Sequence, residues 1–211
     1  MSYFGILNDV TVELRRQVFA AIQETPGFDF NLSGGTVEQI TASPPSETLD
    51  PGDSGILASF YLYHVDISEH ARNQLPLPDR NRPNTFRKPP LPLQLRYLFT
   101  PVSDDESTNQ MLLGRVLQHF HDYPSFETLD KGEGRGAEEI GDAFGGGSSQ
   151  LRVKPDLLSL EQLSQLWNAF SSPYRVALGF LVEVVAVDSG LPPERRQRVD
   201  EFLTVTGKVA P

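Results

Sequence analysis

The stretch YRVALGFLVEVVAVD, residues 174–188, decides the fold. Apolar side chains occupy every second position from Tyr174 to Ala186, while Arg175 and Glu183 fall at intervening positions. In a β-strand, residues two apart point to the same face of the sheet. The stretch therefore predicts a long strand with one wholly apolar face, which other elements must cover.

Two further long strands are predicted upstream of this one. Residues 56–67 are rich in aromatic and β-branched side chains at both parities, which indicates a strand that is covered on both faces or largely so. Residues 93–99 carry apolar side chains at alternate positions and also predict a strand. We expect the proline- and arginine-rich residues 69–92 to form a long loop between them, and residues 36–41 to form a short strand.

Three segments have the apolar spacing of amphipathic helices: residues 6–22, 109–123 and 160–170. The last is preceded by Ser159, whose hydroxyl can accept a hydrogen bond from a free amide of the first turn. Gln162 can reach back to the Ser159 amide, so that the pair predicts a capping box. We also expect a short final helix over residues 192–203.

The predicted order is helix, three strands, helix, short strand, helix and long strand. This order favours one α+β domain, with a mostly antiparallel sheet and helices on its apolar face. We assign residues 1–190 to this domain and residues 191–211 to a short C-terminal extension. The glycine-rich residues 127–150 hold too little apolar surface to order themselves, and we expect a flexible hairpin or insertion there.

Composition excludes several classes of function. The 211 residues carry a formal net charge of −10, so that nucleic-acid phosphates would repel the chain. The absence of cysteine removes disulfides, thiolate metal sites and cysteine catalysis. Charged residues interrupt the N-terminal region, and no apolar run approaches the ~18 residues of a membrane span. We expect a cytoplasmic chain that does not insert into membranes.

The run DPGDSG, residues 50–55, raises the possibility of a catalytic serine at Ser54. A serine hydroxyl needs a positioned base, usually histidine. All four histidines follow Ser54, unlike the order in trypsin-like proteases, and none lies three residues after an aspartate, as an esterase motif requires. We interpret the run as a turn, built from Pro51, Gly52 and Gly55, and predict no catalytic residues.

No metal or cofactor site is predicted either. His119 and His121 lie two residues apart on a predicted helix, where side chains point in different directions. Residues 132–136, GEGRG, lack the lysine of a phosphate-binding loop. Trp167 falls on the apolar stripe of its helix and is interpreted as a core residue.

Charge is distributed unevenly along the chain. Residues 18–71 contain eight acids and no lysine or arginine, whereas residues 72–96 contain six basic residues and one acid. This pattern has two explanations: an ordinary solvated charge distribution, or one acidic and one basic side suited to head-to-tail association in a ring. On the second explanation, the predicted self-assembly residues are Arg80, Arg82, Arg87 and Lys88 on one side and Glu47, Asp50 and Asp53 on the other.

Several passages resemble a known family, in order and spacing. They are Leu62-Tyr63, Arg96-Tyr97-Leu98, Leu112-Leu113-Gly114 with His121-Asp122, and Leu166-Trp167 through Pro173-Tyr174-Arg175. These passages resemble the N-terminal domain of the cap, or tube-terminator, protein of phage-tail-like contractile injection systems of the virulence-cassette and antifeeding-prophage type. The resemblance runs from the first helix to about Asp188.

The resemblance implies a fold like that of phage tail-terminator proteins and a structural role without catalytic residues or cofactors. It implies a hexameric ring on the baseplate-distal end of the inner tube, which stops tube growth and anchors the last sheath ring. The implied partners are further copies of the chain, the inner tube protein and the sheath protein, with assembly in the cytoplasm. No additional C-terminal domain, as found in some relatives, is expected here.

A physical route to sheath binding is strand addition to an exposed sheet edge. The short β-prone segments suited to this exchange are residues 36–41 and the tail, where the predicted contact residues are Thr204, Val205, Thr206 and Lys208. Two other functions remain open: an adaptor that attaches the particle to a membrane or a cytoplasmic partner, and an enzyme that uses Ser54.

Overall fold

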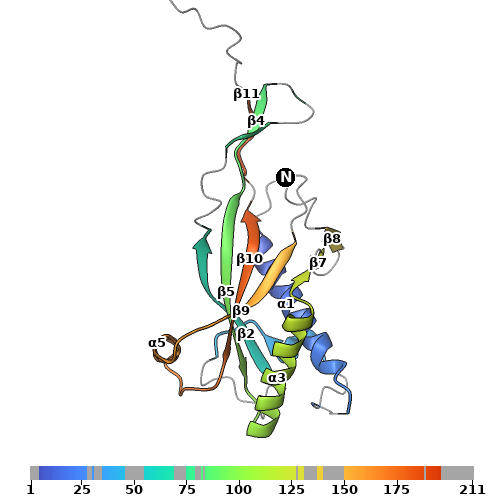
Figure 1. Ribbon diagram of the computed structural model, residues 1–211, viewed down its shortest axis with the longest axis vertical. Coiled ribbons are helices and arrows are strands. Elements are labelled where there is room, and N and C mark those ends of the chain that lie inside the picture. Colours follow the sequence, from blue (N-terminus) through green and yellow to red (C-terminus); the bar gives the residue numbers. More distant parts are fainter. Residues whose placement is uncertain are drawn as a thin grey trace, which may run out of the picture.

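The computed structural model describes residues 5–27, 30, 35–45, 55–68, 75–78, 82, 84–126, 128–130, 137–139, 150–187 and 189–195. Within these ranges a six-stranded sheet is the centre of the molecule, in the order β1-β2-β5-β10-β9-β6 (Figure 1). Its strands are β1 (Ile40–Thr41), β2 (Ala58–Ile67), β5 (Leu91–Pro101), β6 (Ser125–Phe126), β9 (Leu151–Asp156) and β10 (Leu178–Val187). The helices are α1 (Ile6–Gln23), α3 (Glu106–Asp122) and α5 (Leu160–Phe170).

The sheet is mostly antiparallel, as predicted. β5 pairs with β2 on one side and β10 on the other, and β9 follows β10, all antiparallel. Only the short pairing of β1 with the start of β2 is parallel. The α+β fold class inferred from the order of elements is therefore confirmed.

The strand that opened the sequence analysis lies in the middle of this sheet, but its alternation is interrupted. Phe180 and Val182 are fully buried on the apolar face, as the period of two requires. A register shift between Val182 and Val185 then moves Val185 and Val187 onto the same face. A β-bulge inserts one extra residue and reverses the parity that follows. The prediction of strict alternation to Ala186 is wrong for this reason, and residues 174–177 precede the strand.

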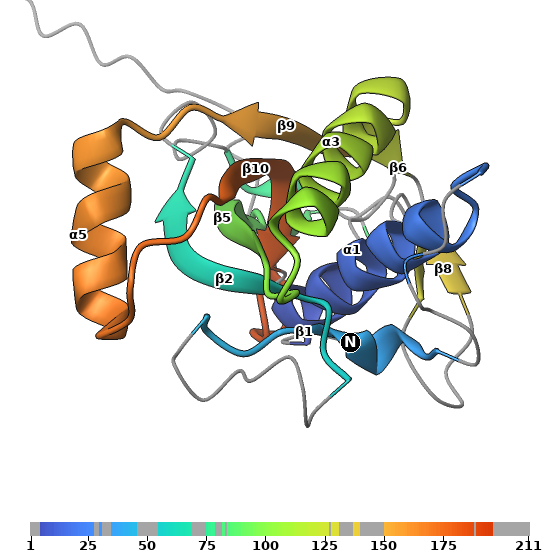
Figure 2. The same cartoon turned by 90° about the horizontal axis from the view of Figure 1, so that it is seen from below.

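α1 and α3 cover the apolar face of the sheet, which curls around them (Figure 2). Phe60 lies at the centre of this core, with its ring centroid 5.3 Å from that of Tyr97, 5.9 Å from Phe180 and 6.3 Å from Phe120. The β2, β5, β10 and α3 side chains thus meet in one aromatic cluster. Arg15 of α1 donates hydrogen bonds to the carbonyls of Val37 and Ile40, which fixes the segment that leads into β1.

α5 lies away from α1 and α3, beyond β2 and outside the curve of the sheet (Figure 2). The prediction that all helices cover the apolar face is wrong for α5. Trp167 is its only buried residue, and Phe170 contacts Tyr61 of β2 at 5.8 Å between ring centroids. The predicted capping box is present, because Ser159 Oγ accepts from the Gln162 amide and Gln162 Oε1 accepts from the Ser159 amide.

Three short segments differ from the sequence predictions. Residues 69–92 are not loop throughout: β3 (Leu77–Pro78) and β4 (Thr85–Arg87) form there. Within residues 36–41, Val37–Gln39 is a 3-10 turn, and only β1 is strand. The final helix does not begin at Pro192, because β11 (Glu194–Arg195) follows as a strand; residues 196–203 lie outside the described residues.

The glycine-rich insertion contains a short antiparallel pair, β7 (Thr128–Asp130) with β8 (Ala137–Glu139). The hairpin predicted there is confirmed for these strands. Residues 127, 131–136 and 140–149 lie outside the described residues.

We expect stability to fall at alkaline pH because of a buried tyrosine. Tyr97 is fully buried, and burial raises the pKa of its hydroxyl well above the usual 10. The unfolded chain therefore ionises first. The stability that depends on a protonated Tyr97 is fully present below pH 10. Above pH 10 the free energy of unfolding should fall by about 1.4 kcal/mol per pH unit, because the unfolded chain loses the proton and the folded chain keeps it.

Urea unfolding of the wild type and of Tyr97→Phe at several alkaline pH values measures this effect. Tyr97 shares a hydrogen bond of 2.9 Å with Thr11. The phenylalanine variant should therefore be less stable at neutral pH by about 1 kcal/mol, yet lose less stability above pH 10. Parallel losses in the two proteins would contradict the assignment.

Candidate assembly surfaces

A small three-stranded sheet projects from one end of the main sheet (Figure 1). Its order is β11-β4-β3, with antiparallel pairing throughout. We call the described residues 75–78, 82, 84–90 and 189–195 the arm. β5 and β10 run side by side to the pair Leu91 and Val187, and the arm continues from these ends. It is thus built from two segments far apart in the sequence.

Local backbone chemistry explains how the arm turns. Asn84 has a φ of 63°, in the left-handed region that asparagine tolerates better than most residues. The Thr85 amide donates to the Arg82 carbonyl at 3.3 Å just before β4 begins. The conformation of Asn84 and this hydrogen bond are typical of a tight turn, which directly precedes β4.

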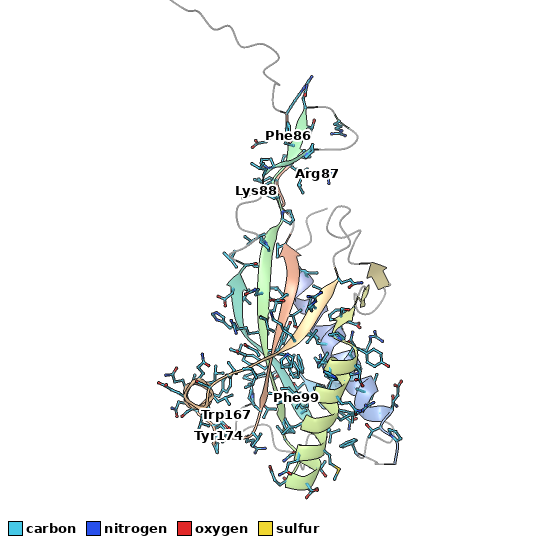
Figure 3. The ribbon with its side chains drawn as sticks, in the orientation of Figure 1. Phe86, Arg87, Lys88, Phe99, Trp167 and Tyr174 are labelled. Atoms are coloured by element: carbon cyan, nitrogen blue, oxygen red, sulfur yellow. The ribbon has the colours of Figure 1, made fainter. Side chains whose placement is uncertain are left out.

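Three of the four basic residues predicted for self-assembly lie on the arm, and Figure 3 shows two of them, Arg87 and Lys88. Arg82, Arg87 and Lys88 are all exposed, and Arg80 lies outside the described residues. Sequence reasoning missed a fourth cation, Arg195, which β11 brings to the arm by pairing with Thr85. Nothing local marks Arg195, because its place depends on a long-range strand pair.

Leucines are also exposed on the arm. The exposed fraction is 82% for Leu75, 67% for Leu191 and 44% for Leu77. Val65 and Ile67 of β2 are 42% and 47% exposed, although Leu95 and Leu93, which lie opposite them on β5, are buried. Exposed apolar residues gathered in this way are typical of contact surfaces.

Arg96 does not belong to the arm, although it falls in the same basic stretch of sequence. Its guanidinium contacts Asp156 Oδ2 at 2.5 Å and Asp66 Oδ2 at 3.4 Å. The hydrogen bond to Asp156 raises the pKa of Arg96, and burial together with the Asp156 carboxylate raises the pKa of Tyr63 to about 12. His64 lies 3.0 Å from Asp66 and lowers the pKa of that carboxyl. This network links β2, β5 and β9 on the face of the sheet opposite α1 and α3.

A depression of about 350 Å³ lies between the start of α3 and the segment that precedes β10. Asp104, Glu106, Tyr174 and Arg175 are among its lining residues. Asp105 caps α3 through the Thr108 amide, and the hydrogen bonds from Thr108 lower the pKa of its carboxyl. Asp104 and Glu106 make this end of the body acidic.

The candidate catalytic and metal residues do not form a site in the described residues. His119 is half-buried against Phe120 and Tyr123, and burial lowers its pKa. Across the described ranges no three histidine, aspartate or glutamate side chains are grouped as metal ligands require. Ser54 lies outside these ranges, and Gly55 after it has the positive φ of 62° that suits a turn.

The other predicted contact residues fall in two segments, residues 47–53 and the tail. The acidic residues Glu47, Asp50 and Asp53, and the tail residues Thr204, Val205, Thr206 and Lys208, lie outside the described residues. Residues 36–41 include β1, which pairs with β2 of its own chain and is an edge strand of the six-stranded sheet; their part in strand exchange stays a prediction. No helix in the described part of the chain has the length and apolarity needed to cross a bilayer.

Comparisons with known proteins give one matching family model and, among solved structures, similar folds. Residues 9–201 match the family described as Pvc16 N-terminal domain. A search of curated proteins gives no match. The fold is similar to the sheath/tube terminator of the extracellular contractile injection system PVC in its extended state, with a TM-score of 0.55 and 16% identity over 96% of this chain and 64% of that chain.

The fold is also similar to the anti-feeding prophage cap, described as a tube-terminating cap. The TM-score is 0.52, with 15% identity over 98% of this chain and 62% of that chain. The chain thus spans less than two thirds of either structure. At these identities the likeness concerns the fold.

Proposed function

The chain belongs to the Pvc16 N-terminal domain family, and from this premise we propose that it is a structural cap of a contractile injection system. It closes the baseplate-distal end of the inner tube and stops tube growth. The observation that carries this proposal is the fold shared over nearly the whole chain with a sheath/tube terminator and a tube-terminating cap. The protein acts through contacts with other subunits, not by catalysis.

The cap is a ring of identical subunits, with six copies as the family resemblance implies. Head-to-tail contacts close into a ring when the rotation between neighbours allows it. In this proposal Arg80, Arg82, Arg87 and Lys88 of one copy face Glu47, Asp50 and Asp53 of the next. The exposed positions of Arg82, Arg87 and Lys88 on the arm support the basic half of this contact.

The particle assembles in the cytoplasm, and the ring is incorporated at its distal end. There it contacts the inner tube protein and anchors the last ring of sheath. The tail residues Thr204, Val205, Thr206 and Lys208 contact tube or sheath by adding a strand to a sheet edge. The β-prone sequence of this segment supports the assignment.

We expect deletion of residues 204–211 to weaken sheath attachment at the capped end while the domain still folds. Electron microscopy of particles that carry the truncated protein measures the fraction with a complete last sheath ring. The full-length protein, expressed from the same vector, is the control. Sheathed, contractile particles at the wild-type frequency would remove the tail from the proposal.

The cap role predicts a large effect on tube length. In particles assembled without this protein, nothing closes the tube, so we expect tubes of uncontrolled length in electron micrographs. Supplying the wild-type chain in trans should restore a narrow length distribution. Tubes of wild-type length in the absence of the protein would contradict the proposed function.

The second candidate is an adaptor between the particle and a membrane or cytoplasmic partner. The exposed leucines and cations of the arm are the observation that favours it. An adaptor would bind a partner that is not part of the particle, without tube protein present. Pull-down experiments with and without tube protein separate the two functions.

A further inference from the structure

We propose that one face of the arm, formed by Leu77, Arg87 and Arg195, is the surface that docks on a second copy of this chain. This inference rests on the proposed function, because a ring requires a contact between copies. It names the residues that make the contact, including one from the segment assigned to a C-terminal extension. The occupant is an acidic surface of the neighbouring copy.

The strand register defines this face. Leu77 of β3 lies opposite Arg87 of β4, and Arg195 of β11 lies opposite Thr85. Residues directly opposite each other share a face, as do residues two apart on one strand. Leu77, Thr85, Arg87 and Arg195 therefore lie together on one side. Phe86 falls on the other side, between Pro78 and Glu194.

The charge of the arm indicates which surface it binds. The described arm carries four cations, Arg82, Arg87, Lys88 and Arg195, and one acid, Glu194. The whole chain has a net charge of −10, so the rest of the molecule is more acidic still. A basic projection on an acidic protein finds its electrostatic complement in another copy. Asp104 and Glu106 are exposed acids next to the start of α3, outside the arm.

Apolar side chains accompany the cations. Leu77 lies on the docking face itself, and Leu75 and Leu191 are further residues of the arm with most of their surface exposed. Arginine is enriched at interfaces, and burial of the neighbouring leucine excludes water from the ion pair that the arginine forms. The contact should therefore be sensitive to salt without depending on charge alone.

Prolines argue against strand addition at the arm. Pro78 lies within the edge strand β3, and Pro193 directly precedes the edge strand β11. Proline lacks the amide that a strand ladder needs, and short edge strands limit pairing further. Side chains, not backbone hydrogen bonds, must therefore supply the contact.

The test measures self-association of Arg87→Glu/Arg195→Glu by sedimentation velocity at low salt and micromolar protein. We expect the wild type to form oligomers and the double variant to associate about 100-fold more weakly or not at all. Arg87→Lys/Arg195→Lys keeps the charge and should keep most of the association. Arg152→Glu, a charge reversal at an exposed arginine of β9, should leave association unchanged.

Salt and mixing provide two further readouts. At about 1 M salt, where the Debye length is about 3 Å, the wild-type oligomers should dissociate substantially. In an equimolar mixture the Glu variant keeps its acidic receiving surface, so it should join wild-type chains and prevent ring closure. Thermal unfolding of both variants checks that the body of the protein is intact.

Three outcomes overturn the inference. They are wild-type association by the Glu variant, a wild-type protein that stays monomeric at low salt, and binding of the arm to phosphatidylcholine vesicles that contain phosphatidylserine without self-association. The first leaves the proposed function untouched if particles lacking the protein still have overlong tubes. Tubes of normal length in those particles remove the proposed function, whatever the oligomeric state.

Discussion

Replacing Phe60 by alanine is expected to lower the free energy of unfolding by about 3–5 kcal/mol. Phe60 is fully buried, and its ring lies against four aromatic rings from three other elements: Tyr97, Phe99, Phe120 and Phe180. The side chains around it cannot collapse into the space, because each is held by its own strand or helix. A loss of this size is a large share of the stability of an ordinary domain.

Urea unfolding, followed by far-UV circular dichroism, measures this loss. Phe60→Leu is the matched control, since it keeps most of the buried volume and should cost less than about 1.5 kcal/mol. Asn168→Ala, at an exposed position of α5, should change stability by no more than about 0.5 kcal/mol. If Phe60→Ala unfolded like Phe60→Leu, the aromatic cluster would not be the centre of the core.

Replacing Trp167 by alanine should release α5 from the sheet. Trp167 is the only buried residue of this helix, and its ring meets Phe170 at 5.9 Å and Tyr174 at 6.2 Å, both edge to face. Truncation of a buried tryptophan costs about 3–5 kcal/mol. Because α5 has little other attachment, we expect the helix to detach before the main sheet unfolds.

Hydrogen exchange separates local release from global unfolding. Amides of α5 should lose protection in Trp167→Ala, while those of β5 and β10 keep theirs. Trp167→Phe is the control: the buried indole Nε1 has no hydrogen-bond acceptor among the described residues, so phenylalanine removes packing area but no hydrogen bond. Equal loss of protection throughout the sheet would show that α5 is part of the core.

Local patterns predicted the long elements well. The period of the apolar residues located α1, α3 and α5, and the capping box at Ser159 fixed the start of α5. β2, β5 and β10 were also predicted from composition and alternation. These features depend on neighbours in the sequence, so one chain is enough to reveal them.

Long-range pairing could not be predicted in the same way. The sequence around the bulge between Val182 and Val185 has the pattern of regular alternation. The extra residue is seen only from the pairing of β10 with β5. β3, β4 and β11 are too short to show a period. The side of the sheet that α5 covers depends on Tyr61, which lies far from it in the sequence.

The candidate contact surface was predicted in part. The basic stretch identified Arg82, Arg87 and Lys88 by charge, and the arm places them on one projection. The same criterion included Arg96, whose ion pairs with Asp66 and Asp156 hold it in the body. Charge counts cannot separate these cases, because the distinction depends on which carboxylates the fold brings near. The acidic residues Glu47, Asp50 and Asp53 remain a prediction.

The arm combines two segments that are far apart in the sequence, and this determines when it forms during folding. In the unfolded chain, joining Thr85 to Arg195 closes a very long loop for few hydrogen bonds, which is entropically unfavourable. Once β5 and β10 are paired, the segments that continue into β4 and β11 already lie side by side. Pairing β4 with β11 then costs little further loop-closure entropy. The arm therefore forms late in folding, after the core of the main sheet. Chains that are not yet folded lack the complete arm and cannot use it to bind a second copy.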